Sequence, residues 1–551
     1  MSTNGSGRRA GLGAIAGLLA AGTALGVGQF VAGLTGADGS PVVAVGQLQI
    51  DFTPPWLKNF AIREFGANDK LVLVSGIVVV LALFSAVIGA AATRRMAYGM
   101  AGLAVFAVVG LTAAATRPTA TFTSLLPTLG AVAAAVAVLR VLIPLVSPAV
   151  TDARPPVAFD PAVSFDPAVS FDPVTGVDPA IEEPQQPGDL EASGGFEPPR
   201  RSFLAASAAT AGIAAGAGLA GRLLSERSSV ASARKALRIP KPSVTTQTLP
   251  PGVNFDIPGL SPFITSNTNF YRVDTAIVLP QVDPASWQLR IHGMVNREIT
   301  LTFDELIKRP LIEDYITLCC VSNPVDGPYI GNALWLGASL AGVLREAGIK
   351  AGADQLLCTS VDGFTSGTPV QTVMDGRDAL LAVAMNGQPL PVAHGFPARM
   401  VVPGLYGYVS ATKWVTDINV TTFAGNYAYW AQRGWSQQAP IKTECRIDVP
   451  NSLNNVKGGT TAVAGVAWAQ HKGIEAVEVR VASGPWNEAT LAAVPGIDTW
   501  RQWVWEWAAT PGPHVIEARA TDKTGYTQTS AQAQPEPNGA SGYPSMSVTV
   551  S

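Results

Sequence analysis

Five long apolar stretches constrain this chain more than any other feature. They are almost without charged residues and run over about 10–34, 71–93, 97–116, 122–147 and 202–224. A helix that crosses a bilayer needs about 20 apolar residues, and each stretch reaches that length. Buried helices of a soluble domain would show an amphipathic period, which is weak here. We therefore predict four transmembrane helices in residues 1–150 and a fifth in residues 200–224.

Arginines at the ends of these stretches predict how the helices are oriented. One side of the membrane would carry Arg8, Arg9, Arg94, Arg95, Arg140, Arg200 and Arg201. The other side would carry Lys58, Arg63, Lys70 and Arg117. Because basic residues concentrate on the cytoplasmic side, we expect a cytoplasmic N-terminus in the cell membrane. Everything after the fifth helix would then lie on the extracytoplasmic face, where residues 54–66 are expected to form an interfacial helix.

The segment between the fourth and fifth stretches repeats with a period of six residues. It reads FDPAVS at 159–164, FDPAVS at 165–170 and FDPVTG at 171–176. Recurrent Asp-Pro disfavours helix, and one acidic residue in each repeat makes the chain repel itself. We interpret residues 151–199 as a disordered, acidic, cytoplasmic linker, with a binding motif as the alternative.

The fifth stretch opens on Arg200, Arg201, Phe203 and Leu204, which resembles a twin-arginine export signal with Pro199 in place of Ser or Thr. The alternative is that both arginines only follow the positive-inside rule. The signal implies the twin-arginine export machinery as a partner and a cofactor inserted before export. Ala231-Ser232-Ala233 has the A-x-A form of a signal-peptidase site, and the alternative is a chance match. Cleavage at this site would release the following domain.

Composition excludes several classes of function. A net charge of −3 provides no basic field for nucleic acid. None of the five stretches contains a histidine, which excludes a membrane haem held by paired histidines. Acidic residues are almost absent from them too, which disfavours an ion path and hence a transporter. We interpret the helices as an anchor in the lipid bilayer, which leaves open docking of a quinone or another membrane partner.

The second half of the chain reads as soluble domains after a basic and Pro-rich linker over 225–260. Patterns predict strands at 287–295 and 355–361 and helices at 301–309 and 333–349. Strands and helices mix without a regular βαβ period, so we predict an α+β domain over 261–436. Gly-rich phosphate loops, HExxH and CxxC are absent, which leaves ordinary nucleotide and zinc chemistry without support.

Four blocks in this domain carry a family resemblance. They are SNTNFYRVD at 266–274, TLCCVSNPVDGPYIGNALWLGASL at 317–340, MNGQPLPVAHGFPARMVVPGLYGYVSATKW at 385–414 and NYAYWAQRGWS at 426–436. Together they resemble the sulfite oxidase superfamily, whose members bind a molybdenum cofactor through a pterin dithiolene and one protein cysteine. The resemblance covers about 260–436 and extends more weakly to the C-terminus. It implies two-electron oxygen-atom transfer on a small-molecule substrate.

The family's Cys-x-x-Asn pattern matches Cys320 and Asn323, which implies that Cys320 is the metal ligand. A thiolate suits a soft metal that sulfur already holds, although a free cysteine is more often a small buried hydrophobe. Cys319 is expected in the core. Cys358 and Cys445 are either packing residues or an external disulfide.

The resemblance also assigns residues around the cofactor. These cofactor-binding residues are Asn269, Tyr271, Arg272, Cys320, Ser360, His394, Arg399, Ser410 and Lys413. Arg399 belongs to the HGFPxR motif and can hold the cofactor's phosphate bidentately, with a structural ion pair as the alternative. The segment around Lys413 is one residue longer than the family pattern.

The resemblance implies catalytic roles for three residues, which are Cys320, Arg272 and Trp435. Arg272 matches a family arginine near the metal, where a cation favours an anionic substrate. The sequence departs from sulfite oxidases in two places. Pro324 follows Asn323 where the family has arginine, and Trp435 replaces the active-site tyrosine. An indole donates a hydrogen bond but no proton, and Trp435 could instead form a pocket wall.

Residues 437–551 alternate as strands and resemble the family's immunoglobulin-like C-terminal domain, which often dimerises. Residues Pro544 to Ser547 replace the sequence that usually ends the family's C-terminal domain. The sequence therefore leaves open whether the protein forms a homodimer. We predict a membrane-anchored, extracytoplasmic molybdenum oxidoreductase, with sulfite-like oxidation and S- or N-oxide reduction as the two directions. Electrons would pass to an external carrier. The alternative is a non-catalytic, membrane-tethered binding protein on the same scaffold.

Overall fold

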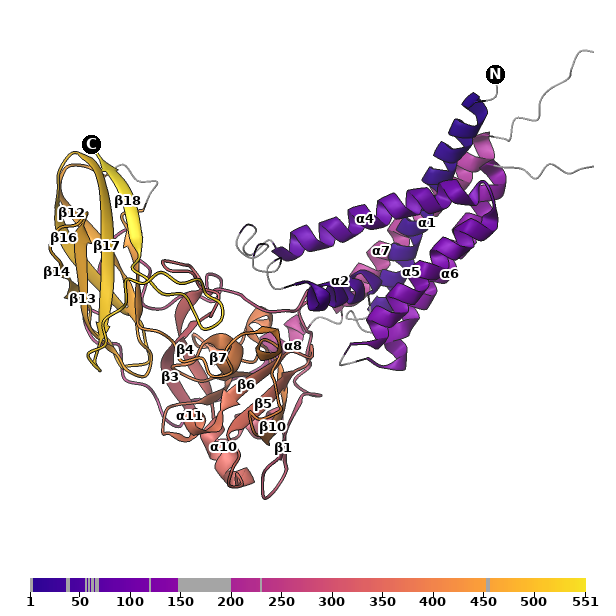
Figure 1. The fold of residues 1–551 in the computed structure, drawn as a ribbon. Coiled ribbons are helices and arrows are strands. Elements are labelled where there is room, and N and C mark those ends of the chain that lie inside the picture. Colours follow the sequence, from indigo (N-terminus) through magenta and orange to yellow (C-terminus); the bar gives the residue numbers. More distant parts are fainter. Residues whose placement is uncertain are drawn as a thin grey trace, which may run out of the picture.

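The computed structural model describes residues 3–35, 40–54, 57, 60, 64, 69–117, 120–146, 200–227, 230–451 and 456–551. The predicted linker 151–199 lies outside the described residues, as does most of the predicted interfacial helix 54–66. Figure 1 shows an elongated helical bundle joined to an α+β domain, with a β-sheet domain at the C-terminus.

The bundle contains the five predicted apolar helices. The helices are α1 (Thr3–Thr35), α2 (Pro41–Phe52), α4 (Asp69–Ala92), α5 (Met96–Ala115), α6 (Leu126–Val146) and α7 (Arg200–Arg227), with the short η3 (Phe122–Leu125) before α6. All but α2 and η3 include a segment long and apolar enough to cross a membrane. Helix α2 has only 12 residues and was not predicted.

Glycines let the long helices approach closely. A Cβ on Gly17 of α1 would lie 2.0 Å from the carbonyl oxygen of Ser85 in α4. On the same helix, a Cβ on Gly26 would lie 2.4 Å from the carbonyl oxygen of Ala214 in α7. Small residues at such crossings allow the backbone contact that drives helix association in lipid. Helix α1 therefore packs tightly against two other helices of the bundle.

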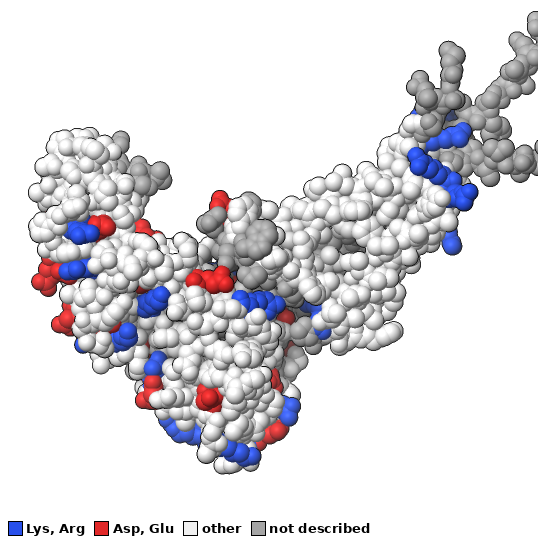
Figure 2. All heavy atoms as spheres, viewed as in Figure 1, with Lys and Arg blue, Asp and Glu red and all other residues white. Residues whose placement is uncertain are grey.

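Charge divides the surface of the molecule (Figure 2). Lys and Arg gather at the end of the bundle that holds the N-terminus, and the rest of the bundle in this view is almost white. The soluble domains carry both signs of charge. Arg8 and Arg9 lie near the start of α1, and Arg94 and Arg95 connect α4 to α5. This distribution agrees with the predicted flanking arginines, while the orientation in the membrane stays a prediction.

Two five-stranded sheets build the α+β domain. The first has the order β2-β1-β10-β5-β6, and the second contains β3-β4-β7-β8 with β9 paired to β7. The strands are β1 (Gln288–Gly293), β2 (Ile299–Thr302), β3 (Leu311–Cys319), β4 (Ile330–Ser339), β5 (Gln355–Ser360), β6 (Thr365–Pro369), β7 (Leu380–Met385), β8 (Gln388–Pro389), β9 (Arg399–Val401) and β10 (Val415–Thr421). The helices are α8 (Ala231–Ala236), α9 (Phe303–Ile307), α10 (Leu340–Ala347), α11 (Val370–Met374) and α12 (Gly407–Ser410), with single turns η4 (Val392–His394) and η5 (Ala431–Arg433).

The predicted helix over 333–349 is wrong in its first half. Residues up to Ser339 belong to strand β4, and α10 begins only at Leu340. Strand β4 pairs with β3 on one side and β7 on the other and is buried along almost its whole length. A strand buried on both faces does not alternate between apolar and polar residues, so its sequence cannot be told from that of a buried helix.

The C-terminal domain consists of two four-stranded antiparallel sheets. They have the orders β11-β12-β16-β15 and β14-β13-β17-β18. The strands are β11 (Glu444–Val449), β12 (Gly459–Trp468), β13 (Ile474–Val481), β14 (Asn487–Glu488), β15 (Thr490–Leu491), β16 (Arg501–Ala509), β17 (Gly512–Asp522) and β18 (Ser545–Val550). Trp503 and Trp507 are buried in its core. Trp500 instead joins the core of the α+β domain, where its indole donates a 2.8 Å hydrogen bond to the carbonyl of Phe263.

Candidate functional site

Cys320 is the first residue after strand β3. Its neighbour Cys319 still pairs with Ile330 across the sheet and is fully buried, as predicted for a core residue. The Cys320 sulfur lies 2.9 Å from the Ser322 hydroxyl, and burial raises the pKa of this thiol while Ser322 and Lys413 act in the opposite direction. The chain thus turns Cys320 out of the sheet next to polar groups. All four cysteines are free and buried, so Cys358 and Cys445 are packing residues.

Arg399 lies at the start of β9, almost completely buried. Its guanidinium donates to the carbonyls of Met400 (3.3 Å), His394 (3.1 Å) and Ala411 (3.2 Å). It also lies 5.1 Å from the centre of the Trp335 ring. Within the part of the chain that the structure describes, it forms no ion pair with a carboxylate, so the alternative of a structural ion pair is not supported. Burial lowers its pKa to about 10.

His394 is the last residue of η4, five residues before Arg399, and is buried as well. Its ring packs edge-to-face on Phe270 with a centroid distance of 5.6 Å. Burial lowers its pKa to about 4, and the charges of Arg399 and Lys413 act in the same direction. The imidazole is therefore neutral near pH 7 and can accept or donate one hydrogen bond.

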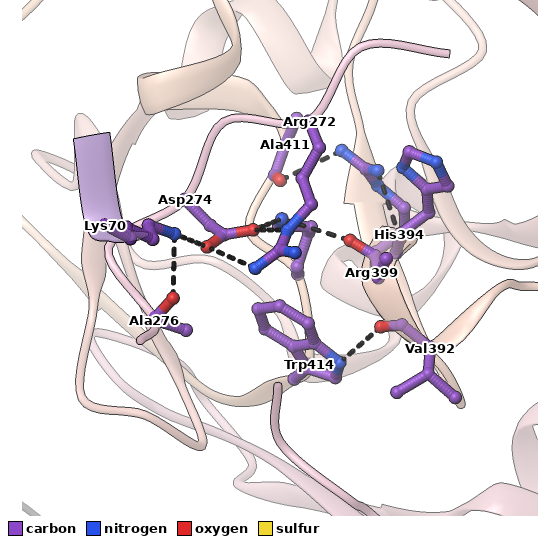
Figure 3. Close-up of polar contacts among 11 residues, drawn as sticks. Lys70, Arg272, Asp274, Ala276, Val392, His394, Arg399, Ala411 and Trp414 are labelled. Carbon is purple, nitrogen blue, oxygen red and sulfur yellow. Dashed lines mark hydrogen bonds and ion pairs between the residues drawn. The ribbon is translucent and has the colours of Figure 1, made fainter. Parts of the chain in front are cut away.

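A buried carboxylate links the predicted cations (Figure 3). The Lys413 ammonium lies 2.6 Å from Oδ2 of Asp274, and the Arg272 Nε lies 2.8 Å from the same oxygen. Lys70, from helix α4, pairs with Oδ1. Burial raises the pKa of Asp274, but the charges of these three cations outweigh it and hold the pKa well below its usual range. Burial lowers the pKa of Lys413 to about 8.

Asp274 and Lys70 were not predicted as site residues. Asp274 ends the same sequence block as Arg272, two residues later, which is the one local signal that could have found it. Lys70 lies 204 residues away from Asp274 in the chain, so no local pattern connects the two.

The remaining predicted residues differ in how they are placed. Tyr271 stacks on Phe270, and a Cβ on Gly407 would lie 3.8 Å from its hydroxyl and 3.6 Å from the carbonyl of Cys319. Burial raises the pKa of Tyr271 well above its ordinary value, and the neighbouring thiols of Cys320 and Cys319 add to the shift. Its hydroxyl is therefore protonated beside the cysteine loop.

Three further predicted residues lie in different surroundings. Asn269 is exposed on the loop before Tyr271. Ser410 is buried at the end of α12, where its hydroxyl lies 3.0 and 3.1 Å from the carbonyls of Leu405 and Tyr406. Trp435 packs its ring against Tyr408 and Trp430, each at 6.0 Å between centroids, which favours a wall or core role over hydrogen-bond donation.

Two orphaned polar atoms test whether these residues suit a bound anionic cofactor. Among the residues that the structure describes, Ser360 Oγ and Asn323 Nδ2 are buried without a hydrogen-bond partner. Ser360 is the last residue of strand β5 and pairs with Val415, which follows Lys413 by two residues. Asn323 belongs to the loop that begins at Cys320. Buried polar groups are nearly always satisfied in proteins, so both call for a partner beyond the chain. With Arg399 and Lys413 beside a soft thiol donor, the set fits an anionic cofactor that carries a soft metal.

Comparison with known proteins gives the family. Residues 276–430 match the family model of the oxidoreductase molybdopterin-binding domain. Mitochondrial sulfite oxidase of Rattus norvegicus is 29% identical over 274 residues, which is 42% of this chain and 49% of the relative. The uncharacterized oxidoreductase YuiH of Bacillus subtilis (strain 168) is 30% identical over 170 residues, which is 30% of this chain and 81% of the relative. The sulfane dehydrogenase SoxCD of Paracoccus pantotrophus aligns with a TM-score of 0.46 at 21% identity over 53% of this chain and 84% of its own.

The family model and the curated relatives confirm the predicted resemblance. The chain belongs to the molybdopterin-dependent oxidoreductases of the sulfite oxidase superfamily, and its cofactor is the molybdenum cofactor. It spans about half the length of the mammalian sulfite oxidases that it matches. The family model begins after Asp274 and ends before Trp435, so it includes Lys413 but not Lys70, Arg272 or Asp274.

Proposed function

We propose that this protein is a membrane-anchored, extracytoplasmic oxidoreductase that moves one oxygen atom to or from a small anionic substrate. Relatives named as sulfite oxidases support the reaction class. Five apolar helices support the anchor. The single observation that carries the choice of an anionic substrate is the cluster of Arg272, Lys413 and Lys70 around one carboxylate, Asp274.

Each residue of the cofactor site has a proposed task. Cys320 would hold the metal through its sulfur, for which a thiolate is the suitable ligand. Arg399 would hold the cofactor's phosphate, since a buried guanidinium without a carboxylate needs an anion. The unpartnered Ser360 hydroxyl and the Asn323 amide would complete the polar shell. When bound, the molybdenum cofactor supplies the two-electron chemistry of oxygen transfer.

The residues that face the substrate come from the cationic cluster. The Arg272 side chain is 38% exposed, so it can leave part of its contact with Asp274 and orient an oxyanion. Tyr271 stays protonated and can donate a hydrogen bond near Cys320. We propose that this phenol takes over the task of the tyrosine that Trp435 replaces. Because His394 is neutral, its imidazole would accept a hydrogen bond without repelling the nearby charges of Arg399 and Lys413.

The route to the membrane is part of the proposal. Arginines at the N-terminal end of the bundle support a cytoplasmic N-terminus, and Arg200-Arg201 supports twin-arginine export. Arg234, directly after the motif at Ala231–Ala233, donates 2.7 Å hydrogen bonds to the carbonyls of Pro389 and Leu390. Because α8 is helical and docked, we propose that the domain stays attached and is not released by cleavage.

A substrate panel tests the proposed reaction. The purified full-length chain, expressed with an intact cofactor pathway, is offered sulfite-like anions with an oxidising dye and S- or N-oxides with a reducing dye. Turnover in either direction, with molybdenum present, supports the enzyme. Protein that contains molybdenum but turns over nothing in either direction would favour the tethered binding protein. Electron transfer to an external carrier and a homodimer through the C-terminal domain stay predictions.

A further inference from the structure

The helical bundle touches the α+β domain next to the cationic cluster. The Lys70 ammonium, in the first turn of α4, donates to the carbonyl of Ala276 at 2.7 Å and pairs with the Asp274 carboxylate. One residue further, Ile277 meets helix α2, since a Cβ on Gly46 would lie 2.8 Å from the Ile277 side chain. That same Cβ would lie 3.5 Å from Ile77 of α4. The segment 274–277 is thus seated on two helices of the bundle.

The seated segment also holds the proposed substrate-binding cations. Asp274 contacts Arg272 with both oxygens, Nε at 2.8 Å from Oδ2 and Nη2 at 3.3 Å from Oδ1. The Lys413 ammonium contacts Oδ2 of Asp274. The Lys70 ammonium contacts Oδ1, as Figure 3 shows. Three cations therefore share one carboxylate whose side chain is only 4% exposed, which leaves a formal charge of +2 in the cluster.

Lys70 and Arg272 both contact Oδ1 of Asp274, and this shared contact determines the expected effect of removing the Lys70 side chain. With Lys70 in place, Oδ1 of Asp274 is already satisfied, and the longer 3.3 Å contact from Arg272 is the weaker of its two. Without Lys70, the 3.3 Å contact between Arg272 and Oδ1 could shorten, and this tighter bidentate pair would withdraw guanidinium N–H groups from the substrate. The cluster would also lose one unit of positive charge. Both effects reduce the affinity of the site for an anion.

We propose that Lys70 of the membrane-associated bundle is a positioning residue of the anion-binding site. It acts through Asp274 on Arg272 and Lys413, so the bundle is part of the active site as well as its anchor. The proposal rests on the proposed function and adds a residue that the family's domain does not contain. It implies that the soluble part of the chain alone would bind anions more weakly than the full-length chain.

Lys70→Met, Lys70→Arg and Lys241→Met in the full-length chain in detergent test this role. Lys241 is an exposed lysine in the linker after α8, so its change to Met matches the loss of charge without touching the cluster. Calorimetric titration with sulfate reports oxyanion binding without turnover, and a dye assay gives KM and kcat. Lys70→Met should weaken sulfate binding and raise KM by about 3- to 30-fold with kcat within about twofold. Lys70→Arg should restore most of the loss, and Lys241→Met should match the wild type.

The possible outcomes separate this inference from the proposed function. Unchanged sulfate affinity and KM in Lys70→Met, with the wild type active, would overturn the role of Lys70 and leave the enzyme assignment intact. A fall in melting temperature with unchanged affinity would assign Lys70 to docking alone and would overturn it too. A wild-type chain that contains no molybdenum would contradict the proposed function, while the sulfate titration would still report on Lys70.

Discussion

Lys413 and Asp274 are 139 residues apart in the chain, yet the Lys413 ammonium lies 2.6 Å from a carboxylate oxygen of Asp274. The contact joins the segment after α12 to the segment that leads into the α+β domain. The same ammonium lies 3.2 Å from the carbonyl of Ala393, beside His394. Through this one lysine, the proposed substrate-binding cluster is connected to the proposed cofactor-binding residues His394 and Arg399.

The affinity for anions should fall as the pH rises through about 8. Burial lowers the pKa of Lys413 to about 8, and deprotonation removes one positive charge from the cluster. Sulfate keeps its charge in this range, so its dissociation constant measured from pH 6.5 to 9.5 should be flat at first and then rise. In Lys413→Arg the rise should move to higher pH, because guanidinium stays charged. An affinity independent of pH in the wild type would contradict the role of Lys413.

Arg399→Lys should impair retention of the cofactor while leaving the fold intact. Lysine keeps the charge but cannot hold phosphate bidentately or make the three carbonyl contacts of the guanidinium. The content of pterin released from the purified protein should fall by about tenfold or more, since lost charge-assisted bonds are each worth about 1.5–3 kcal/mol. The matched control is Arg290→Lys, an exposed pair with Glu298, which should keep full content. Equal pterin content in the two variants would count against phosphate binding by Arg399.

Glu444→Gln should stabilise the protein, and more so at higher pH. Burial raises the pKa of Glu444 to about 8 from 4.5, and one of its oxygens has no partner among the described residues. Between these two pH values the folded state binds more protons than the unfolded state, so the wild type loses stability as pH rises from 4.5 to 8. Glutamine removes this loss, which is on the order of 5 kcal/mol for this pKa shift.

Thermal melts of the full-length protein at pH 5 and pH 8.5 check this prediction. The gap between Glu444→Gln and the wild type should widen at pH 8.5. Glu488→Gln, at an exposed position in the same domain, should melt like the wild type at both pH values. A gap that narrows with pH would show that Glu444 is paired and ionised in the folded protein.

Changing Arg200 and Arg201 together to Lys should strand the α+β domain in the cytoplasm. Lysine preserves the flanking charge but not the twin-arginine signal. The measurement is the accessibility of the domain to protease in spheroplasts. Arg94→Lys with Arg95→Lys changes two arginines at the same side of the membrane and should leave export intact. Normal export of the Arg200/Arg201 variant would leave the two arginines with a topological role alone.

The sequence predicts the five long apolar helices well, because crossing a lipid bilayer would impose a simple rule on their composition. A span must be apolar over its whole length, and all five predicted stretches are helices of sufficient length. Helix α2 escaped prediction because its 12 residues are too short for a span. Strand β4 was partly assigned to a helix because burial on both faces removes the period of a strand.

The site divides in a similar way. The sequence blocks name the proposed cofactor-binding residues, because these residues lie in motifs that match the family. A sequence block does not reveal contacts between distant segments of the chain. The contacts of Asp274 with Lys70 and with Lys413 are both of this kind. A lysine next to an apolar stretch is interpreted as a flanking charge, so the sequence did not indicate that Lys70 contacts Asp274. The Ser410 hydroxyl contacts the carbonyls of Leu405 and Tyr406, and its contact with the cofactor stays a prediction.

The ligand role of Cys320 is the central claim, and X-ray absorption at the molybdenum edge tests it most directly. Purified full-length wild type and Cys320→Ser are compared after expression with an intact cofactor pathway. We expect one fewer sulfur ligand in Cys320→Ser, no turnover, and a melting temperature close to that of the wild type, since serine is nearly the same size. Cys319→Ser, one residue away in the core, should keep the full sulfur count. An identical sulfur count and retained turnover in Cys320→Ser would contradict the account.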